Sequence, residues 1–271
     1  MSAGQSTARA SPGHQSPVTS GYHAPVDLAL VAFVVLVVLV AATAQTLVGF
    51  GFALIAVPLF VTVLDVKDTV VITTLLGLTN NAIVARTAWR HVPWRAVCWM
   101  FAGSLAGMPA GLAVLLFAPE DALRMGVGVS TIVMAAALAS GLRFRSSSIA
   151  SELGVGVVSG VLNTSTSMNG PPVVLYLQGL GHPPQAFRAG LAVFFFSVSV
   201  VTMGAFAATG VVSALALGLA AAALPAVGAG SIAGHALLRR VDPALFRRLV
   251  FALLLAAALS AVASSLARML G

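Results

Sequence analysis

Long apolar stretches separated by short polar interruptions define the pattern of this chain. Most of these stretches reach at least about 18 residues, the length at which an apolar helix can cross a bilayer. The pattern therefore predicts an all-α polytopic membrane protein with about eight to nine hydrophobic segments. The apolar stretches follow a polar tail of residues 1–25, which is predicted to be disordered. They cover 26–47, 50–64, 69–89, 96–117, 122–142, 149–162, 173–180, 185–209, 211–238 and 243–270.

The most informative polar interruption lies at residues 163–172, between two apolar neighbours. Pro171 and Pro172 lack amide hydrogens and disfavour helix before them, so a helix break is expected here. Irregular backbone at membrane depth is tolerated only where protein buries it or a watery cavity solvates it. Such a break, with a helix starting at Pro171 or Pro172, could seat a small oxyanion; a self-satisfied turn at a hairpin tip is the alternative. The hydroxyl and amide side chains of this stretch are Asn163, Thr164, Ser165, Thr166, Ser167 and Asn169.

A second break is predicted at Gly49 and Gly51, which permit sharp turns and close backbone approach. Gln45 and Thr46 supply polar groups just before it, and Pro58 should kink the following arm. Small-residue packing between helices is the alternative explanation of these glycines.

Two adjacent amides, Asn80 and Asn81, fall in the middle-to-inner part of another segment. Polar side chains within membranes tend to face the bundle interior, so these either line a pathway or tie helices together. No Asp, Glu, Lys or Arg falls near the centre of any predicted span, so no carboxylate proton relay is visible. The predicted substrate-binding residues are Gln45, Thr46, Gly49, Gly51, Asn80, Asn81, Thr164, Ser165, Thr166, Ser167, Asn169 and Gly170.

The distribution of Lys and Arg predicts the orientation, because these residues concentrate in cytoplasmic loops. If the loop at Arg90 to Arg95 is cytoplasmic, parity places both termini outside and five of the seven acids outside as well. Each half then consists of a Gly/Pro-broken hairpin followed by three crossings, and the two hairpins enter from opposite faces. This arrangement is an inverted-topology repeat of residues 26–142 and 149–271. The basic residues placed inside are Arg86, Arg90, Arg95, Arg143, Arg145, Arg188, Arg239, Arg240, Arg247 and Arg248.

Composition supports a lipid environment, since 59% of the residues are hydrophobic, 8% are charged and the mean hydropathy is +1.03. A soluble fold of this size could not cover its surface with so few charges. The net charge of +7 is explained by cytoplasmic arginines, and no basic run with interleaved aromatics indicates nucleic acid. One cysteine, five scattered histidines and the lack of a phosphate-binding loop predict no disulfide, metal or cofactor.

The motifs at residues 45–52, Pro58-Leu59, Asn80-Asn81 and 164–172 resemble those of the TauE/SafE family of sulfite exporters. The resemblance extends from about residue 26 to the C-terminus. Gly49, Gly51 and Pro58 match the first Gly-rich hairpin motif of that family, and Gly170 with the two prolines after it matches the second. Where many members carry further glycines in the second motif, this chain has Ser, Thr and Asn, which leaves the substrate open.

The resemblance implies a secondary transporter of the bacterial inner membrane that exports small sulfur-containing or organic anions, such as sulfite or sulfonates, by alternating access. Its partners would be the lipid bilayer and the anion; the oligomeric state is left open. Two alternatives are a non-transporting helper subunit, which would co-purify with one partner, and a membrane-embedded enzyme. The enzyme would need a base near Ser165 or Ser167, and the sequence places no His or Lys at that depth.

Overall fold

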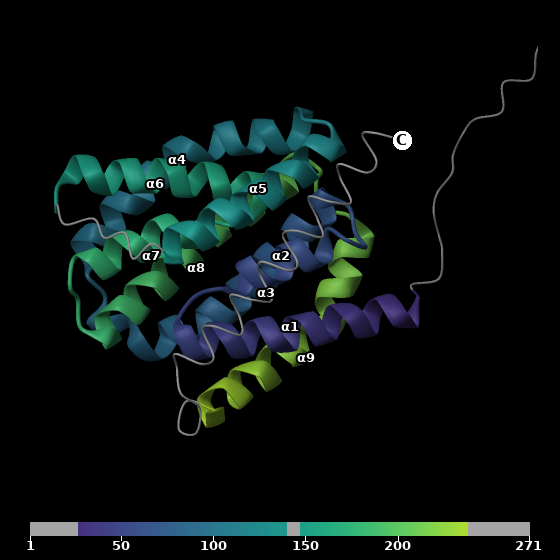
Figure 1. The fold of residues 1–271 in the computed structure, drawn as a ribbon, viewed down its shortest axis with the longest axis horizontal. Coiled ribbons are helices and arrows are strands. Elements are labelled where there is room, and N and C mark those ends of the chain that lie inside the picture. Colours follow the sequence, from purple (N-terminus) through teal and green to yellow (C-terminus); the bar gives the residue numbers. More distant parts are fainter. Residues whose placement is uncertain (1–26, 140–146, 238–271) are drawn as a thin grey trace, which may run out of the picture.

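The computed structural model describes residues 27–139 and 147–237, and every regular element in that part of the chain is helical (Figure 1), as the apolar pattern predicted. The tail of residues 1–25, Arg143, Arg145, and everything from residue 238 onward lie outside the described residues. The helices are α1 (Leu28–Val48), α2 (Phe52–Phe60), α3 (Val66–Ala88), η1 (Trp89–His91), α4 (Trp94–Phe117), α5 (Glu120–Ala139), α6 (Ile149–Thr166), α7 (Gly170–Gly179), α8 (Pro184–Ala208) and α9 (Ala214–Leu237).

Five of the described helices are long and apolar enough to cross a membrane, namely α1, most of α3, α4, α8 and α9. Large apolar side chains such as Leu36, Phe117 and Ile232 are exposed on their outer faces. Apolar surface of this kind on every side is expected where lipid is the solvent. The chain is therefore a multi-pass membrane protein. The full count of membrane segments stays a prediction, because α2 and α7 are short, α5 and α6 are not among these five helices, and the last segment is not described.

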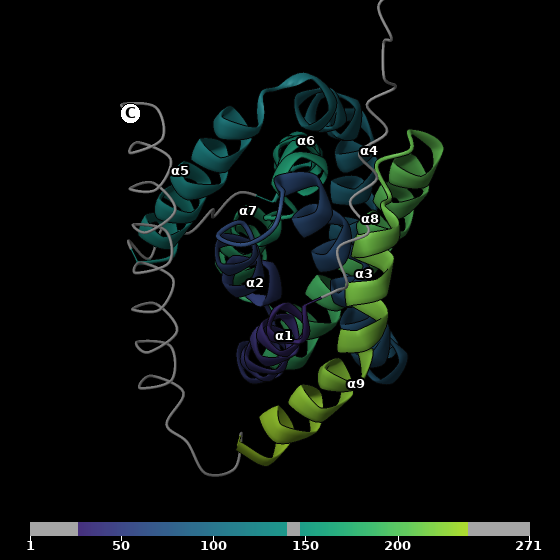
Figure 2. The same ribbon diagram turned by 90° about the vertical axis from the view of Figure 1, so that its right-hand side faces the viewer.

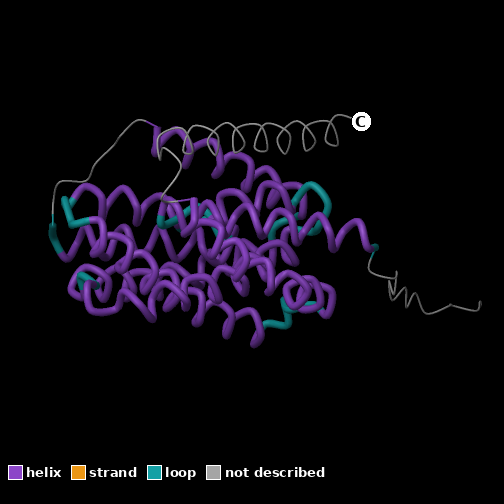
Figure 3. The backbone as a smooth tube through the Cα atoms, turned by 90° about the horizontal axis from the view of Figure 1, so that it is seen from below, coloured by secondary structure: helices purple, strands orange, loops and turns teal. Residues whose placement is uncertain are grey.

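Two tightly packed helix pairs form opposite edges of the described bundle (Figures 1 and 2). At one edge α4 runs along α6, and at the other α1 runs along α9, with α2, α3, α7 and α8 between them. Short loops join the consecutive helices within each of the two described stretches (Figure 3). Buried apolar side chains fill the space around α1 to α3 and again around α4, α7 and α8.

Glycines set the close spacing of both pairs. A Cβ added to Gly107 of α4 would lie 2.1 Å from the carbonyl oxygen of Val157, and one added to Gly160 of α6 would lie 2.2 Å from that of Ser104. No side chain fits at such distances, so the backbones of α4 and α6 touch directly, as in small-residue packing between membrane helices. Gly230 brings α9 against α1 at Leu39 in the same way.

Each of two helical hairpins turns sharply at a residue with left-handed backbone. α1 ends at Gly49 (φ 91°), followed by Gly51 (φ 111°) before α2 begins. α6 ends at Ser167 (φ 60°), and α7 begins at Gly170. The predicted breaks are therefore present, but the second is shorter than expected. It spans only residues 167–169, because α6 stays helical through Thr166.

The prolines lie at helix positions that tolerate them. Pro171 and Pro172 fall in the first turn of α7, where amide hydrogens have no partner within the helix. α7 thus begins one residue earlier than predicted. Pro58 lies inside α2, two residues before its last residue Phe60, and α2 is correspondingly short.

Arg124 in the first turns of α5 fastens this helix to the α2–α3 connection. Its guanidinium donates to the carbonyl oxygens of Val61 and Leu64 and pairs with Asp65 and Glu120. These contacts fix the position of the start of α3 relative to the first hairpin. They therefore also fix how the central residues of α3 lie relative to that hairpin.

Candidate functional site

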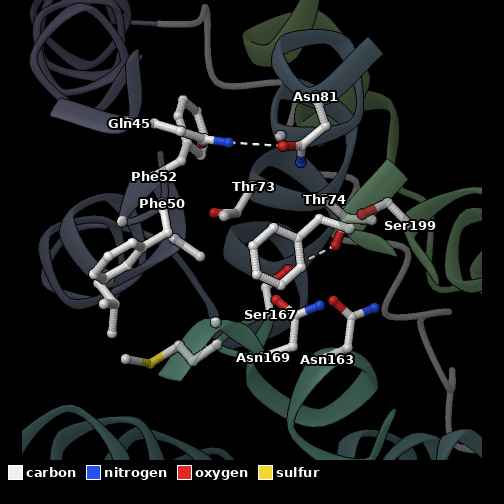
Figure 4. A pocket seen from close by; sticks show the side chains of 17 residues that line it. Gln45, Phe50, Phe52, Thr73, Thr74, Asn81, Asn163, Ser167, Asn169 and Ser199 are labelled. Carbon is white, nitrogen blue, oxygen red and sulfur yellow. Dashed lines mark hydrogen bonds between the residues drawn. The ribbon is translucent and has the colours of Figure 1, made fainter. Parts of the chain in front are cut away.

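A cavity of about 50 Å³ lies where the two hairpin breaks meet the middles of α3 and α8 (Figure 4). A single water needs roughly 10–15 Å³ on this measure, so the space suits a few waters or one small solute. Its position at the centre of two membrane-spanning helices places it near mid-depth. The lining residues with side chains that bear on its chemistry are Gln45, Phe50, Phe52, Thr73, Thr74, Asn81, Asn163, Ser167, Asn169, Phe195 and Ser199.

The first hairpin is tied to α3 beside the cavity by one buried hydrogen bond. The Gln45 amide nitrogen donates to the Asn81 side-chain oxygen at 2.7 Å. Both side chains are buried, and a hydrogen bond fixes two polar groups that would be costly to leave without partners. The bond therefore sets the position of the α1 end relative to the middle of α3.

Three hydrogen bonds anchor the tip of the second hairpin. The hydroxyls of Ser167 and Thr74 lie 2.7 Å apart. The Ser159 hydroxyl donates to the backbone carbonyl of Asn169 at 3.2 Å, and the Asn163 amide donates to the Thr202 hydroxyl at 2.6 Å. The tip is thus held against both α3 and α8, so its polar groups keep a fixed direction.

Two buried donors face the cavity without a partner. The Thr73 hydroxyl and the Asn169 amide nitrogen make no hydrogen bond, although Thr73 is 2% and Asn169 7% exposed. Figure 4 shows both side chains directed into the same space as Ser167. A buried polar group without a partner costs about 1–3 kcal/mol, so a bound hydrogen-bond acceptor would recover that energy.

The backbone adds positive potential to the same place. The N-termini of α2 and α7 begin at Phe52 and Gly170, and both positions line the cavity. The positive end of a helix dipole and its free amide hydrogens favour an anion. No Asp, Glu, Lys or Arg lines this cavity within the described parts of the chain. An anion here would be held by neutral donors and dipoles.

Metal binding and nucleophilic catalysis find little support in this geometry. The described residues contain no group of three His, Cys, Asp or Glu side chains that could hold a metal ion. Ser167 shares its hydrogen bond with Thr74, and no His or Lys lies among the described lining residues to activate it.

Half of the predicted binding residues line the cavity and half do not. Thr164, Ser165 and Thr166 donate instead to carbonyl oxygens of their own helix. Asn80 accepts from Ser231 at 2.8 Å and joins α3 to α9. The residues brought together at the cavity are Gln45, Gly51, Asn81, Ser167, Asn169 and Gly170.

Thr46 and Gly49 lie against a basic side chain outside the cavity. Arg188 of α8 donates to the Thr46 carbonyl oxygen at 2.7 Å, and a Cβ on Gly49 would lie 3.2 Å from its side chain. The arginine therefore caps the C-terminal end of α1, where the helix dipole favours a cation.

The sequence interpretation missed Thr73 and Thr74 on α3, Ser199 on α8, and the three phenylalanines that close the apolar side of the cavity. For Thr73 a signal was present. Thr73, Gly77 and Asn81 follow each other at intervals of four residues, which places them on one face of a helix. The prediction that Asn81 binds the substrate could therefore have been extended to Thr73 on the same helix face.

Most of this chain resembles known proteins. A family model described as "Sulfite exporter TauE/SafE" matches residues 34–261. A curated protein of Cupriavidus necator, the "Probable sulfite/organosulfonate exporter TauE", is 26% identical over 218 residues, which cover 78% of this chain and 85% of that protein. No solved structure gives a significant match.

Proposed function

Because this chain belongs to the sulfite exporter TauE/SafE family, we propose that it is a secondary transporter that exports small sulfur-containing or organic anions, such as sulfite or sulfonates. The observation that carries the proposal is the mid-depth cavity with two unpartnered donors, Thr73 and Asn169, and no charged side chain among its described lining. Neutral donors suit a transporter, because they hold an anion without binding it too tightly to release.

The shape of the cavity supports a compact oxyanion. A sulfite or sulfonate group presents three oxygens, which could accept from Thr73, Asn169 and the first amides of α2. Phe50, Phe52 and Phe195 form an apolar wall that would face the rest of a sulfonate. With a volume of about 50 Å³, the cavity has room for one such head group and little more.

An inverted repeat is the second part of the proposal, and equivalent residues support it. Three pairs of residues line the same cavity, and in every pair the second residue follows the first by the same number of positions in the sequence. The pairs are Gln45 with Asn163, Gly51 with Asn169, and Asn81 with Ser199. Gly49 and Ser167, at that same separation, are the left-handed residues that end α1 and α6. Such a set of matches is expected if α1 to α3 and α6 to α8 are copies of one unit.

The glycine contacts follow the same relationship. A Cβ on Gly111 of α4 would meet Thr164 of α6, and one on Gly234 of α9 would meet Thr46 of α1. Thr46 and Thr164 are again equivalent under the constant separation. The pairing of α4 with α6 thus corresponds to the pairing of α9 with α1, as a pseudo-two-fold axis in the membrane plane requires.

Alternating access is the mechanism that such a symmetry would support. We propose that the two hairpins enter from opposite faces, that the halves rock about the anion, and that the Arg90 to Arg95 loop faces the cytoplasm of a bacterial inner membrane with both termini outside. Cytoplasmic arginines then also raise the anion concentration at the inner mouth.

Reconstitution tests the proposed function. Purified protein in liposomes should release preloaded sulfite or methanesulfonate faster than protein-free liposomes, and either anion should raise the thermal unfolding temperature in detergent. Binding is expected to be weak and reversible because the cavity holds the anion without a charged side chain. If the protein neither bound nor moved either anion, the proposal would fail. Binding without flux would favour the non-transporting helper.

A further inference from the structure

A second cavity, of about 390 Å³, lies at the other end of the second hairpin. It sits between the start of α4, the start of α6 and the α7–α8 loop. Arg95, Ser147, Glu152 and His182 provide its polar lining. The anion cavity described above uses none of these residues, so this second site needs its own explanation.

Glu152 is the one acid in the described parts of the chain whose side chain is buried, at 1% exposure. One carboxylate oxygen accepts from the Tyr176 hydroxyl at 3.4 Å, while the other has no partner. A buried ionised carboxylate is costly unless it is paired or protonated. The unpartnered oxygen is therefore a place where a proton or a cation would be stabilised.

His182 offers a second unpartnered atom in the same cavity. Its ring nitrogen Nε2 is buried and makes no hydrogen bond. Histidine is the side chain whose charge ordinarily changes near neutral pH. Among the described residues, Tyr176 of α7 donates to Glu152 and Arg95 of α4 lines the same cavity.

The chemistry of the lining selects a proton over a metal cation. Sodium, magnesium and calcium prefer shells of several oxygen atoms, whereas this cavity presents an imidazole and a guanidinium beside a single carboxylate. A proton needs only the carboxylate oxygen or the imidazole nitrogen.

We propose that Glu152 and His182 form a proton-binding site whose occupancy is linked to anion binding at the tip of the second hairpin; the inference rests on the proposed function. The second hairpin links the two sites. Glu152 lies in the first turn of α6, whose other end is Ser167 at the anion cavity. α7 returns from Gly170 to Gly179, just before His182. A proton at the base of this hairpin and an anion at its tip therefore act on the same element.

Electrostatics gives the sign and the order of magnitude of the coupling. The fifteen residues of helix between Glu152 and Ser167 correspond to about 22 Å. At an effective dielectric constant of about 20, an ionised Glu152 at that distance weakens binding of a monovalent anion about threefold. Protonation removes this repulsion, so anion binding and proton binding should each strengthen the other.

Calorimetry of methanesulfonate binding in two buffers of different ionisation enthalpy tests the proposal. Methanesulfonate keeps its charge over the whole range, so any proton uptake belongs to the protein. Wild-type protein should take up about a quarter of a proton per anion near the midpoint of the site, the amount that threefold coupling requires. Glu152→Gln should take up almost none while still binding the anion, and His182→Gln should shift the pH at which uptake occurs.

Asp121→Asn is the matched control, because Asp121 is an exposed acid at the start of α5, far along the chain from this cavity. It should keep the wild-type proton uptake. Equal uptake by wild type and Glu152→Gln would overturn the coupling site while leaving the proposed function intact. Absence of methanesulfonate and sulfite binding in the wild type would instead overturn the proposed function.

Discussion

Replacement of Asn169 with aspartate is expected to weaken binding of sulfite or methanesulfonate about a thousandfold. Aspartate has nearly the same shape as asparagine but replaces the unpartnered amide donor with a negative charge that faces the cavity. Two like charges about 4 Å apart repel by roughly 4 kcal/mol at an effective dielectric constant of about 20. Titration of the purified protein by calorimetry measures the loss.

Asn169→Leu separates the charge from the lost hydrogen bond. This variant removes the amide group without adding a charge, and a hydrogen bond to a charged group contributes about 1.5–3 kcal/mol, so the loss should be about tenfold to a hundredfold. The Ser159 hydrogen bond to the backbone of residue 169 survives in both variants, so the hairpin tip should keep its position. Wild-type affinity in the aspartate variant would show that the anion binds elsewhere.

A disulfide between positions 74 and 167 is expected to abolish flux. The Thr74 and Ser167 hydroxyls lie 2.7 Å apart, which brings their Cβ atoms near the separation that a disulfide spans. Thr74 belongs to α3 of the proposed first repeat and Ser167 to the tip of the second hairpin. A cross-link between them should therefore stop any rocking of one half against the other, while anion binding persists.

The cross-linking experiment uses Thr74→Cys with Ser167→Cys in a Cys98→Ala background, since Cys98 is exposed and would react. Oxidation should stop efflux of sulfite from liposomes, and a reductant should restore it. Each single cysteine variant, oxidised in parallel, should keep its flux. Full transport with the disulfide formed would mean that α3 and the second hairpin move together, contrary to the proposed mechanism.

The sequence predicted the helices well because long apolar runs leave the backbone no other way to satisfy its hydrogen bonds in lipid. The end of α1 at Val48 and the start of α7 at Gly170 fall within one or two residues of the glycines and prolines that predicted them. The second break was predicted too long. Ser165 and Thr166 bond to carbonyl oxygens four residues earlier, so α6 accommodates them as helix and continues to Thr166.

The direction of individual side chains was harder to predict. Thr69 and Thr73 lie one turn apart on the same helix, and both hydroxyls are buried without a partner, yet only Thr73 reaches the cavity. That difference depends on where the second hairpin crosses α3, which is set by packing between distant segments. Glu152 is a similar case. Its side chain is almost completely buried and accepts a hydrogen bond from Tyr176 of α7, a contact between segments that no local pattern predicts.

The pair Thr73→Val and Thr69→Val gives the most direct test of the central claim, that the unpartnered donors at the hairpin breaks bind the anion. Valine has the shape of threonine, and both substitutions remove a buried hydroxyl without a partner, so both variants should unfold at or above the wild-type temperature. Calorimetric titration with sulfite should show about tenfold weaker binding for Thr73→Val and unchanged binding for Thr69→Val. Equal affinities in the two variants would contradict the account.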